Sequence, residues 1–117
     1  MNKKNSDNLR SDCPVNAVLE VVGDKWTLLI VRDILLYDSH KYGEFAAMAE
    51  RIPSNILANR LKRLVAHNIL EMVPYQQHPL RYEYHLTTKG RDLEPLVQAM
   101  IHWGLTHVSG TGKSKGF

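Results

Sequence analysis

The stretch Ser54–Leu86, SNILANRLKRLVAHNILEMVPYQQHPLRYEYHL, contains two structural patterns in succession. Three leucines in its first half recur three and four residues apart: Leu57, Leu61 and Leu64. That spacing places them on one face of a helix. Ser54 is a suitable N-cap for this helix, and we expect the pair His67-Asn68 to end it.

The second half changes to the alternation that is typical of β-strands. Residues 69–75 predict one strand, in which Pro74 favours either an edge strand or the end of the strand. Residues 76–80 predict a turn, and the tyrosine-rich residues 81–86 predict the return strand. The whole stretch therefore predicts a helix followed directly by a β-hairpin.

Three more helices are expected before this stretch. Pro14 suits the first position of a helix that is capped by Cys13 or Asp12 and ended by Gly23. Asp24 is a good N-cap for the second helix, which is apolar on much of its surface. After a polar turn over residues 37–41, the third helix is expected to be short and to lie within residues 42–49.

A last helix is expected after the hairpin, with Thr87 or Thr88 as its cap. Pro95 lies inside its apolar pattern and should either kink the helix or mark a shift in its start. This order of elements predicts a mainly α fold with a small β-hairpin, a winged helix-turn-helix with an added C-terminal dimerisation helix. We expect the domain to span residues 13–108, between a flexible N-terminus (1–12) and a flexible tail (109–117).

Composition narrows the class of protein. A chain of 117 residues that is 44% hydrophobic and 23% charged is typical of one globular domain. Its single cysteine cannot form an internal disulfide, which favours a reducing compartment. No apolar run approaches the roughly 20 residues of a membrane span, and no apolar core follows Lys3 and Lys4 as in a signal peptide. We therefore expect a cytoplasmic protein.

No catalytic motif is recognisable. The sequence has no glycine-rich phosphate loop and no serine elbow. None of the six histidines pairs with a carboxylate or another histidine at the spacing of metal ligands. We expect no enzyme activity, no metal site and no cofactor.

The charge pattern favours nucleic acid as the partner. The net charge is only +3, but residues 51–70 contain no carboxylate and four basic side chains. The face of the helix opposite the leucines, together with its basic side chains, supplies the candidate DNA-binding residues: Ser54, Asn55, Ala58, Asn59, Lys62 and Arg63. Short polar groups near a helix start can approach base edges, asparagine can pair with adenine bidentately, and cations can meet phosphates. The alternative is an ordinary solvated helix face.

The hairpin adds two candidates, Gln77 and Arg81, at or beside its tip, with His78 between them. A basic tip next to a recognition helix can reach the neighbouring minor groove or the backbone, whereas a polar turn would be the default without that helix. Arg60 lies beside the leucine stripe, so its stem can instead pack inward and its guanidinium bond a carboxylate.

The last helix carries the candidate dimer contacts: Leu96, Val97, Met100, Ile101 and Trp103. A domain this small is not expected to cover the whole apolar stripe by itself. Dimerisation through this helix would place two recognition helices on successive major grooves of operator DNA. The alternative is a helix packed only on its own domain.

The order of short motifs resembles HxlR-type winged helix-turn-helix regulators over about residues 13–104. The matching segments are CPV (13–15), GDKWTLLI (23–30), YGEF (42–45), IPSNIL (52–57) with Arg60-Leu61 and Leu64, RYEY (81–84), Leu86-Thr87 and Gly90. The resemblance implies a homodimer built on the first and last helices that binds operator DNA. It also implies that some members respond to electrophiles or oxidants through the N-terminal cysteine.

Cys13 has two interpretations. The first, which we rank higher, is a small and partly buried side chain on the first helix. The second is a redox or electrophile switch, because the partial positive charge at a helix N-terminus favours the thiolate. With no second cysteine in the chain, its oxidised product would be a disulfide between subunits or with a small thiol.

The sequence thus predicts a sequence-specific transcriptional regulator that binds an inverted-repeat operator as a homodimer. The runner-up is a protein–protein interaction module that reuses the winged-helix fold. Such a module has no reason to exclude carboxylates from residues 51–70. A small-molecule enzyme ranks third.

Overall fold

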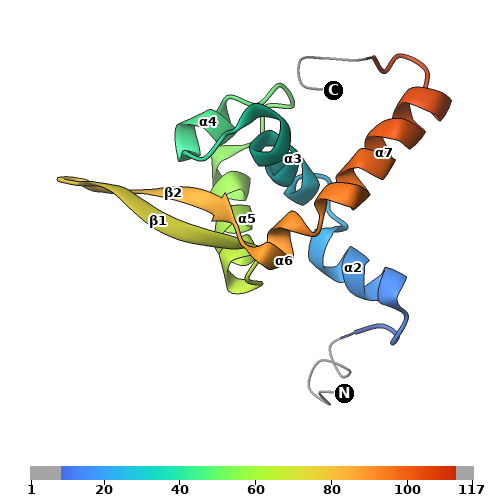
Figure 1. Ribbon diagram of the computed structural model, residues 1–117, viewed down its shortest axis with the longest axis horizontal. Helices are drawn as coiled ribbons and strands as arrows, with labels where there is room; N and C mark the ends of the chain where they lie inside the picture. The colour runs from blue at the N-terminus through green and yellow to red at the C-terminus, as the bar shows by residue number, and fades with distance from the viewer. Residues whose placement is uncertain (1–8, 113–117) are drawn as a thin grey trace.

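The computed structural model describes residues 9–112, so the flexible ends predicted for 1–12 and 109–117 lie partly outside the described residues. The elements are α2 (Pro14–Val22), α3 (Thr27–Tyr37), α4 (Tyr42–Ala46), α5 (Ser54–Ala66), β1 (Leu70–Gln77), β2 (Leu80–Leu86), α6 (Thr88–Arg91) and α7 (Glu94–His107). This is the predicted winged helix-turn-helix, mainly helical, with a hairpin wing and a long C-terminal helix (Figure 1).

The core lies where α3, α4, α5 and the start of the hairpin meet. The leucine stripe of α5 is buried as predicted, and Leu57 has no exposed surface. Leu57 packs in one cluster with Ile30 of α3, Phe45 of α4 and Leu70 of β1. Each such side chain contributes about 1.5–3 kcal/mol by leaving water, so the apolar spacing of α5 fixes which of its faces remains exposed.

Two helix starts differ from the prediction by a few residues. The N-cap position of the second helix is Trp26 and not Asp24, but the Asp24 carboxylate accepts hydrogen bonds from the Trp26 and Thr27 backbone N–H groups at 3.1 Å and so satisfies the helix start. The helix itself begins three residues later, at Thr27. Ser54 is the first residue of α5 rather than its cap, because Pro53 holds the extended conformation of the N-cap position.

The expected last helix is two helices. Thr87 caps α6 by accepting a hydrogen bond from the Gly90 N–H at 3.0 Å. Pro95 lies in the first turn of α7, so it marks a new start and does not kink the helix. Gly90 of α6 is buried, and an added Cβ at this position would collide with the carbonyl oxygen of Ile69, the residue before β1.

The hairpin is longer than predicted. The strands pair antiparallel, and they extend to Gln77 and from Leu80, so the turn is shorter than the predicted residues 76–80. Pro74 does not end β1; it lies at a shift in the register, as a proline can in an edge strand. In a sheet of two strands both strands are edges.

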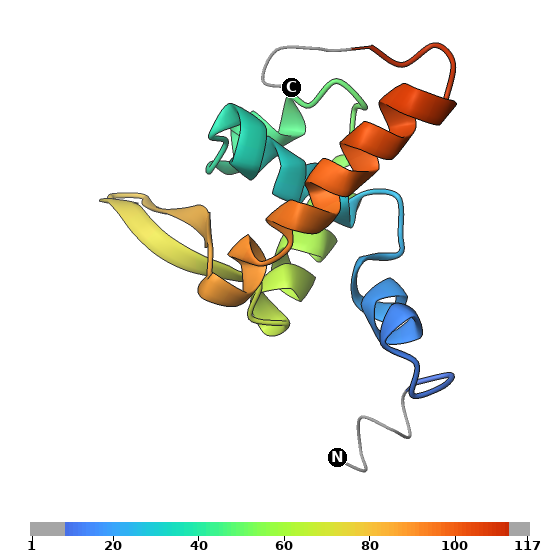
Figure 2. The same ribbon diagram turned by 45° about the vertical axis from the view of Figure 1, so that its right-hand side comes forward.

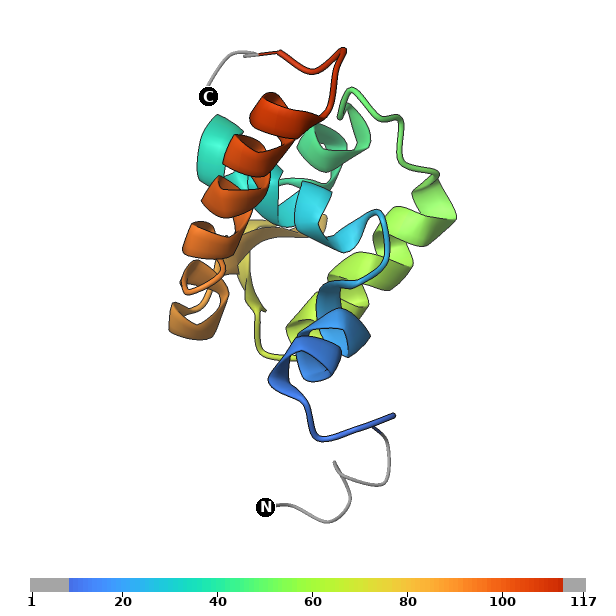
Figure 3. The same cartoon turned by 90° about the vertical axis from the view of Figure 1, so that its right-hand side faces the viewer.

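The wing and the C-terminal helix lie on opposite sides of the domain. Figure 1 shows the hairpin extending from one side, with α2 and α7 on the other. Figure 2 shows α7 packed across α3, and Figure 3 shows α2 beside the C-terminal half of α5. Within residues 9–112 no helix is both long and apolar enough to cross a membrane.

Candidate nucleic-acid interface

One face of α5 is open to solvent along the length of the helix. Its exposed residues include five of the candidates, Ser54, Asn55, Ala58, Asn59 and Lys62, and the last residue of the helix, Ala66. They follow one another at helical spacing on the side away from the buried leucines. The structure therefore brings five of the six candidates on this helix onto one surface, with the small side chains near the helix start and the cation one turn further on.

The sixth candidate, Arg63, lies elsewhere. Its Nη2 donates a hydrogen bond at 2.6 Å to the backbone carbonyl oxygen of Glu20 in α2. This bond directs the guanidinium of Arg63 toward the end of α2 and away from the row of exposed residues on α5. Of the four cations in residues 51–70, only Arg51 and Lys62 have exposed side chains.

Arg60 turns inward and bonds a carboxylate, as its place beside the leucine stripe suggested. Its Nε donates to the Asp24 carboxylate at 2.8 Å, and its Nη1 donates to the Asn59 Oδ1 at 2.5 Å. Burial opposes the charge on Asp24, but hydrogen bonds from Thr27, Arg60 and Trp26 outweigh it and lower the pKa of Asp24 to about 2. Asp24 is therefore ionised at neutral pH, and the contact with Arg60 is an ion pair.

Helix α4 adds two residues that the sequence interpretation did not assign to DNA. The Tyr42 hydroxyl donates to the Ser54 carbonyl oxygen at 3.1 Å, which ties α4 to the first turn of α5. The Lys41 ammonium lies 4.5 Å from the centre of the Tyr75 ring and joins α4 to the wing. Both side chains are exposed. The YGEF motif was the available signal, but its spacing alone suggested only a short helix.

The two wing candidates lie at the far end of the hairpin. The tip of the hairpin lies far from the helices (Figure 1). Gln77 ends β1, Arg81 is near the start of β2, and both side chains are exposed. The neighbouring Gln76 amide donates to the Pro79 carbonyl oxygen at 3.0 Å and closes the turn. The hairpin thus presents Gln77 and Arg81 at a distance from α5, as a second point of contact.

A histidine joins the other end of the wing to the helical body. Nδ1 of His40 lies 2.9 Å from the Tyr84 carbonyl oxygen, and its Nε2 lies 2.6 Å from the Asp38 carboxylate. Both partners are hydrogen-bond acceptors, so this arrangement favours the protonated ring, in which both nitrogens donate. Burial opposes this charge, but these two hydrogen bonds outweigh it and raise the pKa of His40. His85 of β2 stacks on the same ring at 4.2 Å.

The five dimer candidates on α7 divide into two groups. Val97 is 4% exposed and packs in the core of its own domain, so it is not on the surface that a second chain could reach. Trp103 and Met100 are 61% and 51% exposed, while Leu96 and Ile101 are half-buried. On α2, Val15, Val18 and Leu19 are also exposed.

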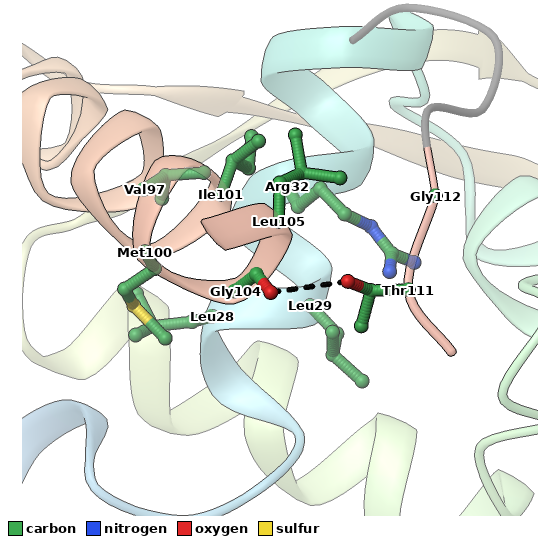
Figure 4. Close-up of a pocket in the computed structure, with 10 residues that line it drawn as sticks. All are labelled: Leu28, Leu29, Arg32, Val97, Met100, Ile101, Gly104, Leu105, Thr111 and Gly112. Carbon is green, nitrogen blue, oxygen red and sulfur yellow. Dashed lines mark hydrogen bonds between the residues drawn. The ribbon is translucent and has the colours of Figure 1, made fainter. Parts of the chain in front are cut away.

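Two hollows border α7. An open apolar groove of about 720 Å³ separates α2 and α3 from the first half of α7, with Val18, Leu19 and Leu96 among its lining residues. A smaller cavity of about 240 Å³ lies between α3 and the second half of α7 (Figure 4). Arg32, the charged residue that lines this cavity, already pairs with Asp33 and Glu50. No cluster of metal-ligating side chains occurs in the part of the chain that the structure describes.

Comparison with known proteins agrees with this geometry. A model of the HxlR-like helix-turn-helix family matches residues 21–111. The chain belongs to this family. The family resemblance and the prediction that the chain is not an enzyme are thereby confirmed.

Individual relatives have the same fold. The HTH-type transcriptional regulator Rv3095 of Mycobacterium tuberculosis is 39% identical over 90 residues, which cover 77% of this chain and 56% of that protein. This chain thus matches only about half the length of that regulator. The crystal structure of PA1607, a candidate transcription factor, superposes with a TM-score of 0.77 at 39% identity, over 90% of this chain and 72% of that one.

A third relative is the redox regulator HypR in its reduced form. It superposes with a TM-score of 0.73 at 33% identity, over 83% of this chain and 95% of that one. In the present structure Cys13 is exposed, which corrects the expectation of a partly buried side chain. The backbone N–H groups of Asn16 and Val15, at the start of α2, lower the pKa of its thiol.

Proposed function

We propose that this protein is a sequence-specific transcriptional regulator that binds an inverted-repeat operator as a homodimer. The observation that carries the proposal is the row of small, amide and basic side chains on the exposed face of α5, followed directly by a wing. Asn55 and Asn59 can reach base edges, and Lys62 can meet a phosphate. Such a role is exercised on the chromosome, which is consistent with the expected cytoplasmic location.

The test is a gel-shift titration of the full chain against genomic fragments at several salt concentrations. Phosphate contacts predict an affinity that falls steeply with salt, and base contacts predict fragments that retain binding in the presence of excess random DNA. Arg81→Ala in the wing should reduce the salt slope by about one unit for each phosphate that the arginine no longer neutralises. Salt-independent binding, or equal binding of every fragment, would contradict the proposal.

A homodimer is supported by the exposed apolar side chains of α2 and α7 and by the groove between them. A second copy of α7 is the natural occupant, since one apolar stripe then covers another around a two-fold axis. Trp103, Met100 and Leu96 would lie at its centre. Two-fold symmetry requires half-sites about one helical turn apart, or a multiple of it.

The competing function is a protein–protein interaction module on the same fold. It would need no row of exposed polar side chains opposite the core of α5, and it would tolerate carboxylates there. The gel-shift titration separates the two functions, because an interaction module would bind no DNA fragment above the random background.

A sensing role for Cys13 is the second candidate function. Exposure and the lowered pKa of the thiol both favour the reactive thiolate. Treating the protein and its Cys13→Ser variant with diamide or a quinone, and then measuring operator binding, tests this role. A sensor requires that only the protein with the thiol responds, whereas an identical response of the two proteins would leave Cys13 without that function.

A further inference from the structure

A chain of hydrogen bonds connects the start of α3 to the exposed face of α5. The Asp24 carboxylate accepts from the Thr27 hydroxyl at 2.5 Å and from the Arg60 Nε at 2.8 Å. Arg60 then donates from Nη1 to the Asn59 Oδ1 at 2.5 Å. Asp24 and Arg60 are both mostly buried, with 21% and 22% of their side chains exposed, whereas Asn59 is exposed.

The hydrogen bond from Arg60 allows only one orientation of the Asn59 side-chain amide. A guanidinium carries only donors, so the amide atom that meets Arg60 must be the oxygen. The Asn59 amino group then points away from Arg60, and within residues 9–112 it has no hydrogen-bond partner. Its two N–H donors therefore remain for a ligand on the exposed face.

We infer that Asp24 and Arg60 are positioning residues that make Asn59 a hydrogen-bond donor to a base in the major groove. This inference rests on the proposed DNA-binding function and adds a base preference to it. The bidentate pair of asparagine with adenine uses the amide oxygen as well as the amino group, and Arg60 already occupies one of the two lone pairs of that oxygen and fixes its direction. With the oxygen held by Arg60, Asn59 favours bases that present acceptors, guanine above all through N7 and O6.

Arg60 is itself held in place by Asp24, and this fixes the orientation of the Asn59 amide. Asp24 also accepts from two backbone N–H groups at the start of α3, so its carboxylate cannot turn away without uncapping that helix. Arg60 is in turn held by an ionised partner, because the pKa of Asp24 is about 2. The Asn59 amide is thus oriented before DNA arrives, and the cost of ordering it on binding is reduced.

The experiment is a selection of binding sites from a random duplex pool by the full chain, with the base preference read at each half-site position. We expect the wild-type protein to prefer guanine at the position that Asn59 meets. Asn59→Asp keeps the shape but removes the donors, and it should shift that position to cytosine, whose N4 group donates. Arg60→Met frees the Asn59 oxygen and should reduce the preference for guanine over adenine about five- to tenfold, as expected for one base contact.

Two further variants make the result specific. Asp24→Asn should reduce the same preference, but it also weakens the cap of α3, so the decision rests on Arg60→Met, which leaves that cap intact. Lys62→Met removes a cation of the same helix outside the chain of hydrogen bonds. It should weaken binding to all sequences alike and leave the base preference unchanged.

Three results would overturn the inference. An adenine preference at the Asn59 position would mean that the amide oxygen is free to pair. An unchanged preference in Arg60→Met would mean that Arg60 does not orient the amide. A uniform loss of affinity in Arg60→Met, for random and selected DNA alike, would make Arg60 a phosphate contact. Failure of the proposed function gives a different result, in which the wild-type protein enriches no sequence at all.

Discussion

Removing the Lys62 ammonium tests the proposed DNA face most directly. Four exposed cations of the helix-turn-helix and the wing are candidates for phosphate contacts: Lys41, Arg51, Lys62 and Arg81. A homodimer carries each of them twice, which makes eight phosphate contacts if all of them engage. At about 0.9 counterions released per contact, the logarithm of the affinity should fall with the logarithm of salt at a slope of about −7.

This slope fixes the size of the effect. Between 50 mM and 200 mM salt, the affinity of the wild-type dimer should fall by roughly 10⁴-fold. Lys62→Ala removes two phosphate-binding cations per dimer, so the slope should become about −5 and the same change in salt should cost only roughly 10³-fold. Specific and random DNA should show the same change in slope, because a phosphate carries no sequence information.

The assay is a fluorescence anisotropy titration of a labelled duplex at five or six salt concentrations. Arg10→Ala is the matched control, since it removes one positive charge near α2, where Arg10 bonds Glu20 at 2.9 Å, on the side away from the wing. Its slope should equal that of the wild-type protein. An unchanged slope in Lys62→Ala, or an equal change in Arg10→Ala, would refute the assignment of this face to DNA.

Three more changes test the interface, the wing and the packing. Trp103→Glu places a charge in the proposed interface and should give a monomer in sedimentation at tens of micromolar, whereas Gln98→Glu, on an exposed position of the same helix, should leave the dimer intact. His40 has a raised pKa, so its contribution to the free energy of unfolding is complete below about pH 6.5 and is lost as the pH rises through the folded-state pKa. Urea unfolding from pH 5.5 to 8.5 should show this loss in the wild-type protein and not in His40→Gln. Gly90→Ala should destabilise the domain by about 1–3 kcal/mol in urea unfolding, because its Cβ meets a backbone carbonyl, whereas Gly104→Ala meets nothing within 4 Å and should stabilise it by about 0.4–1 kcal/mol. Equal midpoints for the two glycine variants would contradict this packing.

The elements that could be predicted are those whose signal is periodic and local. The leucine stripe of α5 has the helical period, and burial of that stripe decides which residues remain outside. The alternation of residues 69–86 is that of a hairpin, and the hairpin is present with only its turn too long in the prediction. The exposed face of α5 followed from these two patterns, because a helix with one buried side leaves the other for a ligand.

The contacts that could not be predicted join residues far apart in the chain. Arg63 reaches a carbonyl oxygen of α2 that lies 43 residues earlier, and no local pattern indicates which of two neighbouring cations turns inward. The raised pKa of His40 depends in part on a carbonyl oxygen 44 residues later. For Arg60, the position beside the leucine stripe did suggest a carboxylate partner. It did not indicate that this partner would be Asp24.

One of these distant contacts also links α2, which borders the proposed dimer interface, to α5, the proposed recognition helix. Arg63 of α5 bonds the carbonyl of Glu20 near the end of α2, and Arg60 bonds Asp24, two residues beyond that end. Because Asp24 is held by the first turn of α3, a displacement of α2 by a partner subunit, or by a modified Cys13 at its start, would act on α5 through the bond of Arg63 to Glu20. The spacing of the two recognition helices in a dimer, and with it the fit to an inverted repeat, would then depend on the position of α2.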